Sequence, residues 1–228
     1  MKSLITLITL ITGCPRSATK YTCILLENCN KDYPHEDKIG KDGLVSWLLN
    51  PTIQNDVKIH QFLNFKKITE KNGKEHFLKR TFHHAPVPTE DLKKQFKILH
   101  QVRHPLSTIN SLCKLREKSW EWAASFCPIE LKASKILRGM QFWYYWNLMA
   151  EEQASWTFKI ESLENPEIYN KFCQELDIDI ELFLKALETT PKNINKRFKG
   201  TKLTWENLKN NNEELYEKIR EMSGRYGY

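Results

Sequence analysis

The sequence predicts a three-layer α/β/α fold with a central, mostly parallel sheet. Residues 4–10 form an apolar, β-branched run, and a short loop then leads into apolar residues at helical spacing. Residues 96–102 form a second apolar run, which precedes a helix that begins at Pro105. Because strands and helices alternate in this way, we expect the two strands to lie parallel in one sheet.

Length and composition limit the domain organisation and the partners. The chain has 228 residues, 40% of them hydrophobic and 11% aromatic, so we expect a single domain over residues 1–228. A formal net charge of +7 favours an anionic partner. The charges are dispersed, however, and we expect no nucleic-acid partner. Beyond the N-terminal run, no apolar stretch approaches the ~20 residues of a membrane span.

The six cysteines form no CxxC pair and no cysteine–histidine spacing of the kind that binds metal. They are Cys14, Cys23, Cys29, Cys113, Cys127 and Cys173. We therefore expect reduced thiols in a cytoplasmic protein, most of them core residues, and no metal ion.

The first loop, ITGCPRSATKY (residues 11–21), has three interpretations. The first is a lipoprotein cleavage site before Cys14, because a small residue follows an apolar segment. The charged region is minimal, though, and cleavage would remove the first strand. The residues after the loop, including Tyr21 and Leu25, have helical spacing, with Ser17 expected as the helix cap. A strand, loop and helix in one unit is therefore favoured.

The second interpretation is a nucleotide-binding P-loop. Unpaired amides and the helix dipole make the start of a helix an anion site. The Walker pattern G-x-x-x-x-G-K-[ST] begins at Gly13, but its second glycine is missing and Lys20 lies one position late. No strand-end aspartate is obvious as a Mg²⁺ ligand. A small-molecule kinase is therefore an alternative function that fits poorly.

The third interpretation is more specific, because GCPRSATKY resembles the 5′-phosphosulfate loop of the sulfotransferase family, Gly-x-Pro-(Arg/Lys)-Ser-Gly-Thr. Ala18 replaces the usual glycine, and alanine would be strained there if the backbone needs a positive φ. A non-catalytic nucleotide-binding relative therefore stays a second alternative. The resemblance implies a P-loop NTPase-like fold and the donor 3′-phosphoadenosine 5′-phosphosulfate. The implied donor-binding residues of the loop are Pro15, Arg16, Ser17, Ala18, Thr19 and Lys20.

A second motif supports the same resemblance. The family holds the 3′-phosphate of the nucleotide with an arginine that ends a later strand and a serine in the next helix. The segment FKILHQVRHPLSTINSL supplies Arg103 and Ser111 at the matching spacing. Arginine offers a planar pair of donors to a phosphate, and serine adds a hydroxyl donor.

A third segment, YPHEDKIGKDGLVSWLL, resembles part of a bacterial branch of these enzymes. His35 and Glu36 follow the first predicted helix, and transfer to a hydroxyl needs a base near the acceptor. The resemblance implies that one of them is this base. The alternative is structural, with Glu36 paired to a lysine and His35 packed in a turn.

The rest of the chain is consistent with the same fold. We expect a long helix over residues 129–153, a strand over 155–163 that ends at Glu161, and short helices near 165–176 and 180–188. Thr204 is expected to cap the helix after a basic loop. Arg197 and Lys199 in that loop either contact the 3′-phosphate or are solvated. A hairpin is expected around Asn72-Gly73.

The resemblance also implies a mechanism. The sulfuryl group leaves a phosphate oxygen, and the loop amides and Arg16 stabilise the charge that develops there. Lys20 is expected to assist, and the scheme requires no metal. The acceptor is expected to be a small molecule or a glycan with a hydroxyl or amine. Carbohydrates, lipids, small alcohols, peptide tyrosine and antibiotic scaffolds all stay open, and the sequence assigns no oligomeric state.

Overall fold

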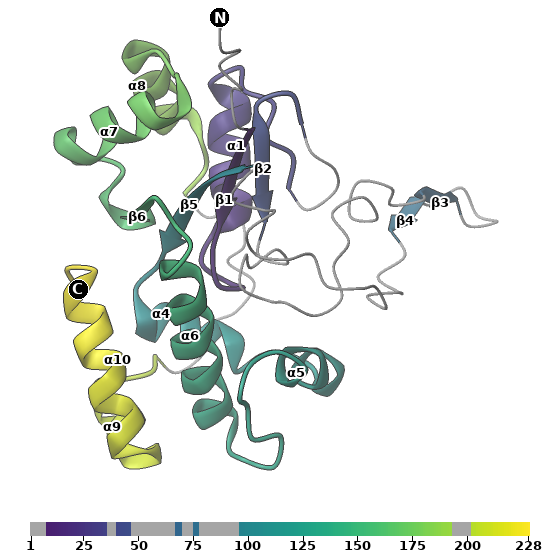
Figure 1. Cartoon of the computed structure of the whole chain (residues 1–228), viewed down its shortest axis with the longest axis vertical. Coiled ribbons are helices and arrows are strands. Elements are labelled where there is room, and N and C mark those ends of the chain that lie inside the picture. The colour runs from purple at the N-terminus through teal and green to yellow at the C-terminus, as the bar shows by residue number, and fades with distance from the viewer. Residues whose placement is uncertain (1–7, 36–39, 47–66, 70–74, 78–95, 193–201) are drawn as a thin grey trace, which may run out of the picture.

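The computed structural model describes residues 8–35, 40–46, 67–69, 75–77, 96–192 and 202–228. A four-stranded parallel sheet with the order β2-β1-β5-β6 lies at its centre (Figure 1). Its strands are β1 (Ile8–Thr12), β2 (Gly43–Ser46), β5 (Phe96–Val102) and β6 (Trp156–Lys159). The α/β class and the parallel sheet expected from the sequence are confirmed.

The register of the sheet brings the ends of its two central strands together. Thr12 at the end of β1 pairs with His100, two residues before the end of β5. Because the strands are parallel, the loop after β1 and the loop after β5 leave the same edge of the sheet. Ligands of open α/β sheets bind outside the carboxyl ends of the strands, which is this edge.

Helices cover the sheet on both faces (Figure 1). Their bounds are α1 (Thr19–Asn28), α4 (Pro105–Leu112), α5 (Glu117–Ala124), α6 (Lys135–Glu151), α7 (Pro166–Leu176), α8 (Ile180–Thr189), α9 (Trp205–Asn211) and α10 (Glu213–Arg225). Leu99 of β5 belongs to a core shared with α1, α7 and α8. Its neighbour His100 faces the opposite side, where its Nε2 lies 3.0 Å from Oδ1 of Asn147 in α6.

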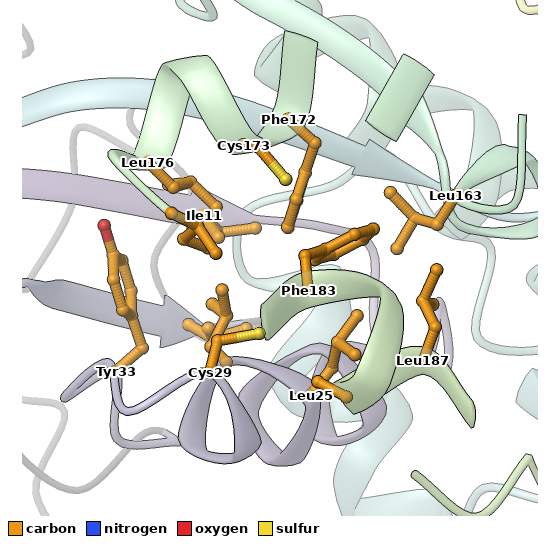
Figure 2. Close-up of a cluster of buried hydrophobic side chains, with 14 of the residues drawn as sticks. Ile11, Leu25, Cys29, Tyr33, Leu163, Phe172, Cys173, Leu176, Phe183 and Leu187 are labelled. Carbon is orange, nitrogen blue, oxygen red and sulfur yellow. The ribbon is translucent and has the colours of Figure 1, made fainter. Parts of the chain in front are cut away.

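The core that contains Leu99 joins one face of the sheet to three helices (Figure 2). Ile11 of β1 and Leu25 of α1 are fully buried in it. Phe172 of α7 and Phe183 of α8 pack with their ring centroids 5.5 Å apart. Burial of these apolar side chains stabilises the fold by roughly 1.5–3 kcal/mol each, and it holds α1 against β1.

Several local expectations are confirmed because their signals are local. Asn165 caps α7 by accepting a hydrogen bond from the backbone of Glu167, and Pro166 follows in the first turn. Thr204 caps α9 in a reciprocal arrangement with Asn207. Two short strands, β3 (Lys67–Thr69) and β4 (Glu75–Phe77), pair antiparallel as a hairpin requires. The predicted turn at Asn72-Gly73 lies outside the described residues.

Two element boundaries differ from expectation. The long helix begins at Lys135 rather than at residue 129, because Ser134 accepts a hydrogen bond from the backbone of Leu137 and so caps it. The strand expected to end at Glu161 ends at Lys159, and Glu161 lies in a 3₁₀ turn, Ile160–Ser162. This turn directs Glu161 toward the segment after β5. Within the described ranges, no helix is long and apolar enough to cross a membrane.

Candidate functional site

The loop between β1 and α1 has an unusual backbone. Arg16 and Ala18 have φ values of 74° and 72°, in the left-handed region. A Cβ atom on Gly13 would come within 2.6 Å of Oγ of Ser17 and 2.7 Å of the carbonyl oxygen of Gln101, so only glycine fits there. Alternating backbone conformations of this kind turn successive amides toward a common concave side, which suits an anion.

The side chains of the loop divide into two groups. Arg16 and Lys20 are exposed, whereas Pro15 and Thr19 are buried. The first turn of α1 contains no acidic residue, so the positive end of the helix dipole is uncompensated by its own side chains. The two positively charged side chains of the loop therefore face solvent, whereas Pro15 and Thr19 are packed in the interior.

Ser17 does not cap α1, contrary to expectation. Ala18 occupies the cap position in its left-handed conformation, and no side chain caps the helix. Ser17 is 1% exposed, and among the described residues its Oγ atom has no hydrogen-bond partner. A buried hydroxyl without a partner is costly, and the oxygen of a bound anion would supply the partner.

Gln101 of β5 binds the loop between β1 and α1 through its side chain. It was not predicted as a site residue. Its side chain is fully buried. Nε2 donates to the carbonyl oxygen of Ser17 at 2.6 Å, and Oε1 accepts from the hydroxyl of Thr22 at 2.5 Å. A single amide thus ties β5 to both the loop and α1. The only sequence signal for this role is a polar residue inside an apolar strand.

Arg103 connects the second predicted motif to the first. It follows the end of β5, and its Nη1 atom donates to the carbonyl oxygen of Arg16 at 3.1 Å. Pro105 then begins α4, as expected. Ser111 lies in the last turn of the same helix and is partly buried. The structure therefore brings Arg103 to the loop between β1 and α1, and it places Ser111 on the helix that follows Arg103.

His35 also reaches the loop. It forms a parallel bridge with Val45 of β2, and its Nε2 atom lies 3.0 Å from Oγ1 of Thr19. Burial, together with the nearby charge of Lys20, lowers the pKa of His35 to about 4, so the imidazole is neutral at pH 7. Glu36, Arg197 and Lys199 lie outside the described residues, and their expected roles stay predictions.

Cys14 lies in the same loop but does not suit nucleophilic chemistry. It is 1% exposed, and burial raises the pKa of its thiol well above the ordinary value. The thiolate is the reactive form of cysteine, so a thiol held neutral in this way is inert. In the ranges that the structure describes, no group of three or more histidine, cysteine or acidic side chains could hold a metal ion.

The residues after α10 lie beside the segment that follows Arg103. The hydroxyl of Tyr228 donates to Oε2 of Glu161 at 2.7 Å. Oε1 of the same carboxylate accepts from the backbone N–H of His104 at 3.0 Å. The residue before α4, the 3₁₀ turn and the residues after α10 therefore meet next to Arg103.

Comparison with known proteins supports the class of fold. No protein-family model matches the sequence, and no curated protein matches it. Among solved structures, it is similar to mouse sulfotransferase SULT7A1 complexed with PAP, with a TM-score of 0.52 and 16% sequence identity. The likeness covers 96% of this chain and 87% of that chain. The chain therefore has the α/β fold of a sulfotransferase.

Proposed function

We propose that the protein is a sulfotransferase that uses 3′-phosphoadenosine 5′-phosphosulfate as its donor. The observation that carries the proposal is the 3.1 Å hydrogen bond from Arg103 to the carbonyl oxygen of Arg16. Each residue belongs to a phosphate motif recognised independently, and the motifs lie far apart in the sequence. A nucleotide with phosphates on both its 5′ and 3′ positions accounts for two adjacent anion sites.

The residues of the loop suit the 5′ end of such a donor. Backbone amides at the start of α1, the buried hydroxyl of Ser17 and the exposed side chains of Arg16 and Lys20 would bind the phosphosulfate. Arg103 and Ser111 would bind the 3′-phosphate, with Arg197 and Lys199 as further candidates. Thr19 contributes a hydroxyl from the first position of α1.

The proposed reaction breaks the bond between sulfur and the bridging phosphate oxygen while a bond forms from the acceptor oxygen or nitrogen to sulfur. The electron pair of the broken bond stays on the phosphate oxygen. Amides of the loop and the guanidinium of Arg16 stabilise this charge. The acceptor proton passes to a base, for which we propose Glu36 first and His35 second. A small molecule or glycan is the proposed acceptor.

A comparison of ligands by thermal melting tests the function. At a hundredfold excess over Kd, 3′,5′-ADP stabilises the protein by about 2.7 kcal/mol, which raises Tm by roughly 5–10 °C for a chain of this size. ATP with Mg²⁺ gives no comparable shift. Acceptors are then screened with labelled sulfate. A shift with ATP-Mg²⁺ alone would instead indicate a kinase, and binding of 3′,5′-ADP without any transfer would indicate a non-catalytic relative.

A further inference from the structure

The last residue of α10 and the three residues after it, 225–228, are held along the edge of the sheet by side chains from α6 and β6. Glu151 at the end of α6 accepts from Arg225 and from the hydroxyl of Tyr226, each at 3.2 Å. The ammonium of Lys159 donates to the carbonyl oxygen of Gly227 at 2.7 Å. Figure 1 shows the C-terminus beside β6. These contacts place Tyr228 next to His104, the residue before α4.

Tyr228 is linked by hydrogen bonds to the peptide unit next to Arg103. Its hydroxyl donates to Oε2 of Glu161, and Oε1 of Glu161 accepts the N–H of His104, the residue that follows Arg103. The rings of Tyr228 and His104 also pack edge to face, with centroids 5.1 Å apart. Tyr228 therefore restrains the carboxylate of Glu161 and also His104, the residue that follows Arg103 in the chain.

The charges around Tyr228 favour this arrangement. Burial and the charge of Glu161 raise the pKa of Tyr228, whereas the charge of Arg103 acts in the opposite direction. The phenol therefore stays protonated and donates. Glu161 is occupied by Tyr228 and His104, and it forms no ion pair with Arg103 in the described structure. The guanidinium is thereby left to the donor loop and to an incoming phosphate.

We propose that Tyr228 is a positioning residue for Arg103, and that it sets the affinity of the site for the 3′-phosphate of the nucleotide. Loss of its hydroxyl frees one oxygen of Glu161 to turn toward Arg103 and loosens the peptide unit after Arg103. The inference rests on the proposed function. It adds Tyr228 to the residues of the two phosphate motifs, which lie between Gly13 and Ser111.

Tyr228→Phe tests this role with two probes, 3′,5′-ADP and adenosine 5′-monophosphate, which lacks the 3′-phosphate. In calorimetric titrations the affinity for 3′,5′-ADP falls about three- to tenfold, the range of one ordinary net hydrogen bond, because Tyr228 acts on the site indirectly. The affinity for adenosine 5′-monophosphate is unchanged. Because a general loss of structure would weaken both ligands, the ratio of the two affinities separates positioning from folding.

Tyr226→Phe is the matched control. It removes another tyrosine–glutamate hydrogen bond of the same segment, but one that ends on Glu151 rather than beside Arg103. Both affinities stay as in the wild type. In a Glu161→Ala background, Tyr228→Phe lowers neither affinity further, since the tyrosine hydroxyl acts through this carboxylate.

The outcomes distinguish this inference from the proposed function. If the wild type binds 3′,5′-ADP no better than adenosine 5′-monophosphate, the proposed function is wrong. If the wild type prefers 3′,5′-ADP and Tyr228→Phe keeps that preference, the function stands and the inference is overturned. Equal losses for the two ligands in Tyr228→Phe also overturn it.

Discussion

The hydroxyl oxygen of Thr19 lies 3.0 Å from Nε2 of His35. This contact joins the first residue of α1 to the segment that carries both candidate bases. A hydroxyl has one proton, so Thr19 can donate it either to the neutral imidazole or to a phosphate oxygen. Under the proposed function, donor binding and the tautomer of His35 would therefore be coupled through one hydroxyl group.

The first prediction is that stability falls as the pH is lowered from about 6.5 to about 4. Burial lowers the pKa of both His35 and His100 to about 4 from an ordinary value of 6.5. Between these values the unfolded chain binds protons that the folded chain does not, so acid favours unfolding. Urea unfolding measured from pH 4 to pH 7 checks this. His35→Gln makes the dependence shallower, and an unchanged slope in that variant would exclude His35 as a contributor.

The second prediction concerns the catalytic base. Glu36→Gln lowers turnover by roughly 10²–10⁴ at saturating donor, the usual contribution of a general base, and leaves the affinity for 3′,5′-ADP unchanged. His35→Gln keeps near-normal turnover, because Nε2 of His35 is already engaged by the hydroxyl of Thr19. Rates are measured with an acceptor found in the screen. The reverse pattern assigns the base to His35, and normal turnover in both variants places it elsewhere.

The third prediction separates the two phosphate sites. Arg103→Ala weakens binding of 3′,5′-ADP by about ten- to a hundredfold, because a hydrogen bond to a charged group is lost. Adenosine 5′-phosphosulfate, which lacks the 3′-phosphate, loses much less. Arg116→Ala is the control, since this exposed arginine precedes α5 and belongs to neither phosphate motif. Calorimetry with both ligands decides, and equal losses would show that Arg103 does not contact the 3′-phosphate.

The fourth prediction is that Ala18→Gly stabilises the protein by about 1 kcal/mol. Ala18 has a φ of 72°, a left-handed conformation that costs an L-residue roughly 1–2 kcal/mol and glycine little. Ala124→Gly is the opposite control, because at the last residue of α5 it adds backbone freedom to the unfolded chain without relieving strain, and it therefore destabilises the protein. Denaturant unfolding measures both. Equal destabilisation by the two substitutions would mean that the backbone at Ala18 is not strained.

The structure also answers a question that the sequence raised about position 18. The sequence alone left open whether alanine in place of glycine is compatible with the loop. Ala18 adopts the left-handed conformation in spite of its Cβ atom. The carbonyl of Ser17 next to it is held by Gln101. Contacts with β5 therefore offset the local strain, so the substitution does not exclude the donor loop.

What the sequence by itself determined is the set of features that depend on neighbours in the chain. The apolar runs of β1 and β5, the proline that begins α4 and the cap at Thr204 are local signals, and the structure confirms them. The spacing within each phosphate motif is likewise a property of a short segment. Local signals suffice there because strand pleat, helix period and caps act over a few residues.

Only the tertiary structure decided which residues complete the site. Gln101 and Ser17 are 84 positions apart, and Tyr228 and Glu161 are 67 positions apart, so no local pattern connects them. The prediction that Ser17 caps α1 was wrong for a related reason. Close packing of the loop against Gly13 and Gln101 sets its backbone, and Ala18 occupies the cap position. These contacts exist because parallel strands end at one edge of the sheet, where loops distant in sequence meet.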